Sequence, residues 1–477
     1  MEKNIKKNKE LNIFEAIIPV IFLMILLAYN IFYADGVLLG DYSNQFILLF
    51  SAGFALIVGL LNKVGIFDMF REVLMNFKSV LIPILILLLV GALSGTWLVS
   101  GIIPAMVYYG LQILNPAVFL PASMLIASLI SLATGSSWTT SATVGIALIG
   151  IGTALGIPVG MIAGAVISGA YFGDKLSPLS DTTNLAPAMA GTDLYTHIRY
   201  MTYTTIPTYV ISIFIFSVLG FFTDTKGVTD VPNILISIEE TFVITPLLFA
   251  VPALVIVLIL FKTKPLIALS SGIFLAVGCA FYFQPKLLAS LSESNLKSIL
   301  NVIWSETSIA TDNEALTKLY NAKGMLGMLW TILLILSAMV FGGIMEAMGA
   351  LGKITAVLLS FAKSVFGLFL STALSCIGLN VIASDQYLAI VIPGKMYKNA
   401  FKEKGLAPEN LSRTLEDAGT VTSVLIPWNT CGAYQSEVLG VGVGEYFMYA
   451  IFNWLSPITT LLFAAFHIKI RTLIPAK

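Results

Sequence analysis

The sequence has little charge and no excess of either sign. Charged residues make up 11% of the 477 residues and hydrophobic residues 57%, whereas soluble domains carry roughly a quarter charged residues. The formal net charge is +0, so the basic excess typical of nucleic-acid-binding proteins is missing. These deficits argue against an ordinary soluble protein, and no nucleic-acid partner is expected.

Residue types that hold metals or supply catalysis are also scarce. The three cysteines lie far apart, and the two histidines, His197 and His467, are interpreted as solvated residues at the membrane interface. The Gly-Lys pair at 352–353 lacks the preceding glycine and the following Ser or Thr of a phosphate-binding loop. No HExxH or GxSxG motif occurs. The sequence therefore predicts no enzyme, no ATP-driven pump and no cofactor.

Long apolar runs are abundant, and each can cross the roughly 30 Å of hydrocarbon in a bilayer. The predicted fold is an all-α, polytopic transmembrane helical bundle with about 11–13 membrane segments. A Lys-rich tail, residues 1–12, precedes the first run, which is interpreted as an uncleaved span rather than a signal peptide. Basic clusters at 63–78, 262–264, 395–413 and 469–477 predict that these loops and both termini are cytoplasmic.

Polar interruptions divide the chain into a first transmembrane half at residues 13–284, a polar connecting loop at 285–324 and a second transmembrane half at 325–477. Each half carries two polar breaks, at 134–140 and 173–187 in the first and at 380–386 and 418–432 in the second. Paired breaks are typical of transporters built from two inverted repeats, whose broken helices or re-entrant hairpins line the substrate site. Chance similarity between Ser/Thr-rich loops is the alternative.

Glycines recur at every fourth position from Gly152 to Gly164. On one helix they would form a narrow face that lets a neighbouring backbone approach closely. Pro158 interrupts this stretch, so we expect it to kink the helix or split it in two. Close helix packing and proximity to a ligand both fit this pattern.

Three carboxylates lie in the polar breaks, Asp174, Asp181 and Asp385. Burying a carboxylate at membrane depth costs free energy, so such residues usually have a function. We therefore predict that these three bind an ion or a proton. Neighbouring side chains supply the oxygen ligands that sodium prefers, at Ser177, Ser180, Thr182, Thr183 and Asn184. Sodium is placed at Asp181 and Asn184, and desolvation of Asp181 would let it hold a proton when sodium is absent.

Structural alternatives remain open for each carboxylate. Asp174 could cap a helix or pair with Lys175, Asp181 could be a helix N-cap, and Asp385 could lie in a loop mouth. Lys175 also bears on the substrate, because an ammonium at the site would suit a carboxylate or amino-acid substrate.

Polar residues in the remaining breaks are predicted to line a substrate cavity: Thr134, Ser136, Ser137, Trp138, Ser384, Gln386, Thr422, Ser423, Trp428, Asn429 and Thr430. For the two tryptophans, anchoring at the membrane interface is the alternative. The cavity would then be formed by both halves of the chain.

The run TGSSWTT at 134–140, followed by GDKLSPLSDTTNLA at 173–186, resembles the NhaC family of bacterial sodium/proton antiporters in the wider ion-transporter superfamily. The resemblance extends over most of the chain, including PWNT at 427–430. It implies an inverted-repeat fold with re-entrant hairpins, a bacterial plasma-membrane location and secondary active exchange of Na⁺ for H⁺ by alternating access. The family is similar to malate/lactate and amino-acid carriers, so coupled antiport of a small organic anion or amino acid is the alternative.

The expected partners are therefore small ions and membrane lipid, with an organic anion or amino acid under the alternative. Na⁺ and H⁺ would be transported or coupling ions rather than cofactors. The sequence leaves open the ion stoichiometry, the pH regulation and the oligomeric state, a homo-oligomer included.

Overall fold

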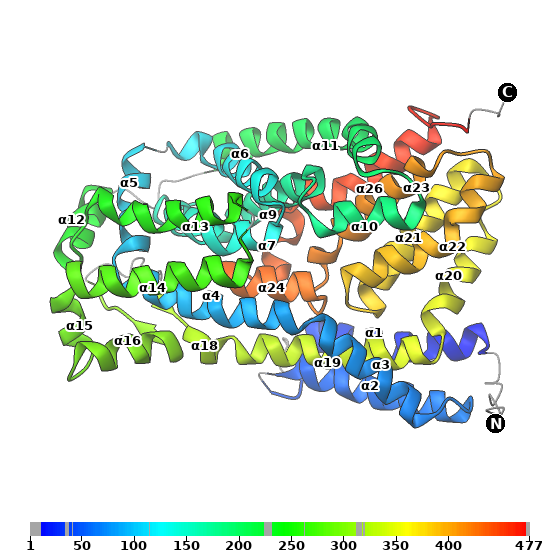
Figure 1. Ribbon diagram of the computed structural model, residues 1–477, viewed down its shortest axis with the longest axis horizontal. Coiled ribbons are helices and arrows are strands. Elements are labelled where there is room, and N and C mark those ends of the chain that lie inside the picture. Colours follow the sequence, from blue (N-terminus) through cyan, green and yellow to red (C-terminus); the bar gives the residue numbers. More distant parts are fainter. Residues whose placement is uncertain are drawn as a thin grey trace.

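The computed structural model describes residues 11–473, apart from 34–37, 41, 114, 224–230, 262, 312–316, 318 and 319. Of the predicted N-terminal tail, only positions 11 and 12 are therefore described. The described residues are predominantly helical, with one small antiparallel sheet of β1 (Thr307–Ser308) and β2 (Asn321–Ala322). In Figure 1, α12 and α15 lie at one end of the longest axis and α20, α22 and α23 at the other. The predicted all-α helical bundle is confirmed.

Eight helical stretches in the described residues are long and apolar enough to cross a membrane: α1 (Ile13–Tyr33), α2 (Ser43–Leu61), α4 (Leu81–Val99), α6 (Pro116–Thr134), α11 (Leu194–Phe222), α14 (Pro265–Phe283), α18 with α19 (Gly324–Gly327 and Leu329–Ala347) and α21 (Val365–Ile382). Two bent pairs raise this number to ten: α12 (Val231–Thr241) with η2 (Pro246–Phe249) and α13 (Ala250–Leu260), and α25 (Val443–Tyr446) and η5 (Phe447–Tyr449) with α26 (Ile451–Ala465). Neither of these bends was expected, because the predicted breaks lie at 134–140, 173–187, 380–386 and 418–432.

Shorter elements make up most of the rest: α3 (Ile66–Ser79), α5 (Ile102–Ile113), α7 (Ser137–Thr140), η1 (Ser141–Gly145), α8 (Ile146–Ala154), α9 (Val159–Leu176), α10 (Asp181–Ala190), α15 (Pro285–Leu291), α16 (Asn295–Trp304), α20 (Ala350–Ser360), α22 (Gln386–Glu403), α23 (Pro408–Leu415), η3 (Glu416–Thr420), η4 (Ser423–Leu425) and α24 (Thr430–Leu439). Several expected crossings are divided among these pieces, which explains why fewer uninterrupted spans are present than the sequence predicts. The connecting segment 285–324 carries α15, α16 and the small sheet.

The short polar break of each half has the same local design. After α6, Gly135 adopts a left-handed conformation with φ 71°, and the Ser136 side chain then caps α7. After α21, Ser384 has φ 59°, and the Asp385 side chain caps α22. A positive φ is uncommon for a residue other than glycine and is often found at functional sites. The match supports the predicted correspondence of the two breaks, while the inverted relation of the halves stays a prediction.

The glycine row is not the face of one helix. Gly156, with φ +74°, lies in the turn after α8, and Pro158 is the N-cap of α9, so the expected split occurs there. A Cβ atom on Gly160 would lie 2.3 Å from the carbonyl oxygen of Glu445, and one on Gly164 would lie 2.4 Å from that of Tyr449. The glycines of α9 therefore allow close contact with the backbone of α25 and η5.

This contact predicts that Gly164→Ala destabilises the protein. The added methyl group would meet backbone atoms that cannot rotate away, and such overpacking costs about 1–3 kcal/mol. Gly53→Ala in α2 is the matched control, because a Cβ atom there has nothing within 4 Å and alanine is the better helix former by about 1 kcal/mol. Thermal unfolding in detergent should give a lower melting temperature for the first variant only; equal values would contradict the packing.

Candidate functional site

A cavity of about 730 Å³ lies where polar breaks of the two halves meet. The start of α7, the break between α9 and α10 and the start of α22 form its polar wall, and α4, α13, α14 and α19 contribute apolar residues. Eleven sequence-predicted site residues line it: Thr134, Ser136, Ser137, Trp138, Asp174, Ser180, Asp181, Thr182, Asp385, Gln386 and Thr430. The structure thus brings together residues that are up to about three hundred positions apart in the chain.

Two of the three cavity carboxylates are buried. Asp174, near the end of α9, accepts hydrogen bonds from the Ser137 hydroxyl at 2.7 Å and from the Ser137 N–H at 3.2 Å. Asp385 accepts a bond from the N–H of Leu388 at 3.0 Å and so caps α22. Asp174 therefore connects the long break of the first half to the short one.

Asp181 is exposed, and this overturns the expectation that it is desolvated. It is the first residue of α10, while Ser180 is the N-cap of that helix. An N-terminal carboxylate of this kind interacts favourably with the partial positive charge of the helix end. Desolvation therefore applies to Asp174 and Asp385, while Asp181 lies on the wetter side of the cavity.

The other eight predicted site residues do not line the cavity: Ser177, Thr183, Asn184, Ser384, Thr422, Ser423, Trp428 and Asn429. Several of them hold the breaks in shape instead. The Asn184 amide donates to the carbonyl oxygens of Pro178 and Ser180 at 3.0 and 2.7 Å. In the second half, the Asn429 amide donates to the carbonyl oxygen of Asn380 at 3.0 Å. The predicted pairing of Asp181 with Asn184 around sodium is thus not supported by a shared place in the cavity.

Both tryptophans of the polar breaks pack against other parts of the protein. The Trp138 ring stacks on Tyr434 of α24, with ring centroids 3.9 Å apart. Trp428 is 7% exposed, and its indole N–H donates to the carbonyl oxygen of Val381 at 2.8 Å. Trp138 therefore lines the cavity, whereas Trp428 hydrogen-bonds to the backbone near the end of α21.

A buried ion pair that the sequence did not predict lies behind the cavity. The ammonium of Lys175 contacts the carboxylate of Asp417 in η3, and both side chains are fully buried. Asp417 also accepts hydrogen bonds from Ser456 at 3.1 Å, from Thr204 at 2.9 Å and from Thr460. Lys175 thus pairs with the second half of the chain, neither with Asp174 nor with a ligand in the cavity.

Two basic residues near this pair, Arg413 and His197, are buried, whereas the lysines at 395, 398 and 402 are exposed as expected. The predicted basic loop at 395–413 instead forms α22 and α23, and Arg413 is fully buried with its guanidinium 4.7 Å from the ring centre of Tyr200. His197 is also buried, with its Nδ1 atom 2.8 Å from the Ser412 hydroxyl. The spacing of charges from Arg413 to Asp417, which is one helical turn, is a signal that could have indicated a helix here.

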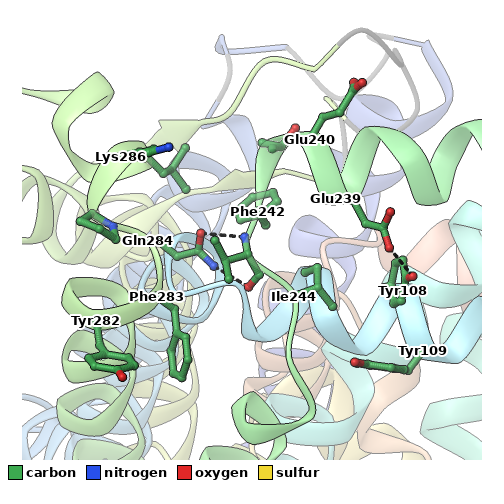
Figure 2. Close-up of a pocket in the computed structure, with 14 residues that line it drawn as sticks. Tyr108, Tyr109, Glu239, Glu240, Phe242, Ile244, Tyr282, Phe283, Gln284 and Lys286 are labelled. Carbon is green, nitrogen blue, oxygen red and sulfur yellow. Dashed lines mark hydrogen bonds between the residues drawn. The ribbon is translucent and has the colours of Figure 1, made fainter.

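A second cavity, of about 750 Å³, lies at the other end of α14 (Figure 2). In its wall, the Gln284 side chain makes two hydrogen bonds to the backbone of Val243. It accepts from the N–H at 3.1 Å and donates to the carbonyl oxygen at 2.9 Å. Tyr108 and Glu239, which are hydrogen-bonded, lie opposite in Figure 2. Because α14 has 19 residues, roughly 28 Å of helix separates this cavity from the first. No predicted site residue lines it.

Comparison with known proteins places the chain in a family. A model of the Na⁺/H⁺ antiporter family matches residues 169–468, which include the cavity carboxylates and Asp417. The chain belongs to the Na⁺/H⁺ antiporter family. The predicted NhaC-type resemblance and the prediction of a secondary active antiporter are thereby confirmed, and the chain is a multi-pass membrane protein.

The relatives of this antiporter differ in the substrates that their names state. The Na⁺/H⁺ antiporter NhaC of Alkalihalophilus pseudofirmus is 37% identical and covers 86% of this chain and 87% of its own. The malate-2H⁺/Na⁺-lactate antiporter of Bacillus subtilis is 35% identical and covers 93% of this chain and 92% of its own. The arginine/ornithine antiporter ArcD of Halobacterium salinarum is 37% identical and covers 80% of this chain and 77% of its own.

A solved structure, that of Neisseria gonorrhoeae MtrF, covers 84% of both chains at 15% identity. Its TM-score is 0.35. This value is too low to relate the two arrangements helix by helix.

The ion pair predicts that Asp417→Leu lowers the free energy of unfolding by about 3–5 kcal/mol, because it leaves the buried ammonium of Lys175 without a counter-charge. Lys175→Met combined with Asp417→Leu should recover much of this loss, since no charge then stays unpaired. Lys323→Met is the control: its partner Glu437 is 2.7 Å away, but the lysine side chain is 52% exposed, so the expected cost is about 0–1 kcal/mol. Detergent unfolding curves of the wild type, Asp417→Leu, Lys175→Met and the double variant measure the coupling, with Lys323→Met as the control. A double-variant effect equal to the sum of the two single effects would contradict it.

Proposed function

We propose that the cavity between the two halves binds Na⁺ and H⁺ in turn and exchanges them across a bacterial plasma membrane. The observation that carries the proposal is the presence of three carboxylates, Asp174, Asp181 and Asp385, in one cavity with no Lys, Arg or His among its described lining residues. Carboxylate and hydroxyl oxygens are the ligands that hard cations prefer. A proton competes for the same carboxylates, so one ion leaves as the other binds.

The helix ends at the cavity favour a cation over an organic anion. The starts of α10 and α22 border the cavity, and the partial positive charge of a helix start attracts anions. Here each start already has its own carboxylate, Asp181 on α10 and Asp385 on α22. A malate or lactate ion would therefore meet two carboxylates before it reached the helix ends.

We infer that the cavity faces the cytoplasm. Ser79 at the end of α3 and Pro265 at the start of α14 line it, and the adjacent Lys78 and Lys264 carry positive charge. Positive residues concentrate on the cytoplasmic side of membrane proteins. Exchange then requires a second arrangement in which the same carboxylates are accessible from the opposite side, as alternating access provides.

Antiport through these carboxylates predicts that Na⁺ collapses a preformed proton gradient in everted vesicles containing the protein. Asp174→Asn should abolish this response, since the amide neither carries the proton nor supplies a charged ligand. Asp181→Asn should raise the Na⁺ concentration for half-maximal response, because an exposed charge is screened and contributes attraction rather than a desolvated ligand.

Asp193→Asn is the control for these variants, because Asp193 caps α11 outside the cavity and asparagine caps equally well. Fluorescence of a pH-sensitive dye records the gradient. A wild-type protein whose proton movement is independent of Na⁺ would refute the proposal. Counterflow of labelled malate, lactate, arginine or ornithine into proteoliposomes identifies the organic-substrate alternative, for which we expect no uptake above that of empty liposomes.

A further inference from the structure

Glu416 is a buried carboxylic acid that the cavity mechanism does not use. It is fully buried at the start of the π-helix η3, next to Asp417. Neither of its carboxyl oxygens has a partner within hydrogen-bonding distance among the described residues, and the donor that interacts with it is the Thr420 hydroxyl four residues along η3, which has no other partner there. π-Helical turns inside α-helices are frequent at functional sites. A carboxylate left in this condition needs a physical explanation.

The explanation is the protonation state. An ionised carboxylate in a dry interior without hydrogen bonds is costly by several kcal/mol, whereas the neutral acid is far less so. Lys175 and Asp417 neutralise each other in their ion pair, so neither is available to compensate Glu416. The arrangement is therefore that of a carboxyl group holding its proton.

We propose that Glu416 is a proton-binding residue of the antiport cycle, separate from the carboxylates that line the cavity. The inference rests on the proposed exchange of Na⁺ for H⁺. In the step, water reaches η3 in one arrangement of the alternating-access cycle, the Glu416 O–H bond breaks, the proton passes to this water, and a carboxylate is left; rebinding reverses it. Arg413, three residues earlier, is a buried guanidinium whose Nε and Nη2 atoms lack partners among the described residues. The ionisable groups that interact with its charge are Tyr200 and Asp417.

Coupling to the cavity is electrostatic. The ionisable groups whose charges act on Glu416 are Asp174 and Lys175 of α9 and the adjacent Asp417. A sodium ion at Asp174 neutralises that carboxylate, which makes the surroundings of Glu416 more positive and favours loss of its proton. Protonation of Glu416 has the opposite effect and favours release of sodium.

Most of the other ionisable groups packed around η3 belong to α22 and α23. α21 contributes the Cys376 thiol, on which the charge of Glu416 acts. α26 carries no charged residue, and α10 carries only Asp181. The charged residues of the two remaining neighbours, α22 and α23, are Lys395, Lys398, Lys402, Glu403, Glu409 and Arg413.

The test separates proton coupling from cation binding in proteoliposomes that contain wild-type protein, Glu416→Gln or Glu416→Asp. Exchange of ²²Na⁺ for unlabelled Na⁺ at equal pH on both sides requires cation binding and alternation but no net proton release. Na⁺-driven proton movement requires cation binding and alternation and, in addition, net proton release. We expect Glu416→Gln to keep the ²²Na⁺ exchange within about twofold and to lose the Na⁺-driven proton movement by about a hundredfold or more, a loss typical for removal of a positioned acid.

Glu416→Asp retains the acid and should restore part of the proton movement. Glu437→Gln, whose carboxylate pairs with the half-exposed Lys323, is the control for a Glu-to-Gln change and should leave both readouts unchanged. Equal loss of both readouts in Glu416→Gln, or retention of both, would overturn the inference while leaving the proposed function intact. Absence of any ²²Na⁺ exchange in the wild type would instead refute the proposed function.

Discussion

The ion pair between Lys175 and Asp417 fixes the orientation of the helix that carries the cavity carboxylate. Asp174 and Lys175 are consecutive on α9, so their side chains point about 100° apart around the helix. When Lys175 is held by Asp417 and Ser456, Asp174 is turned toward Ser137 and the cavity. A buried charge that loses its partner is costly, so rotation of α9 is opposed by the second half of the chain. The geometry of the site in one half thus depends on a residue in the other.

Helix breaks give the cavity its chemistry and also its shape. Each short break combines a left-handed residue with a polar N-cap, at Gly135 and Ser136 in one half and at Ser384 and Asp385 in the other. Backbone groups freed by such breaks are tolerated at membrane depth only where protein or a wet cavity satisfies them. Asp385 therefore has two roles, as a cap that ends the break and as a carboxylate in the cavity.

The sequence predicted the parts of this site whose signal is local. A carboxylate or a run of hydroxyls inside an apolar stretch stands out by itself, and Asp174, Asp181 and Asp385 were found in this way and line one cavity. Burial could not be predicted equally well, because the side of a break that faces water is decided by packing; Asp181 is exposed for that reason. The partner of Lys175 lies 242 positions away, and the polar composition of α23 and η3 is the same as that of a solvated loop. Only the fold reveals that these charges compensate one another inside the bundle.

Charge balance then explains why exchange is obligatory in a cavity of this kind. A carboxylate such as Asp174 is tolerated in the interior when it binds a proton or a cation. An empty, ionised cavity would have to keep uncompensated charges buried while its access switches from one side of the membrane to the other, which is costly. The Lys175–Asp417 pair is neutral and adds nothing to this cost. A buried acid beside it changes the net charge by one when it gains or loses a proton, and its field reaches Asp174. Occupation of the cavity and protonation of Glu416 are therefore opposed by simple electrostatics, which links the two ions without a contact between their sites.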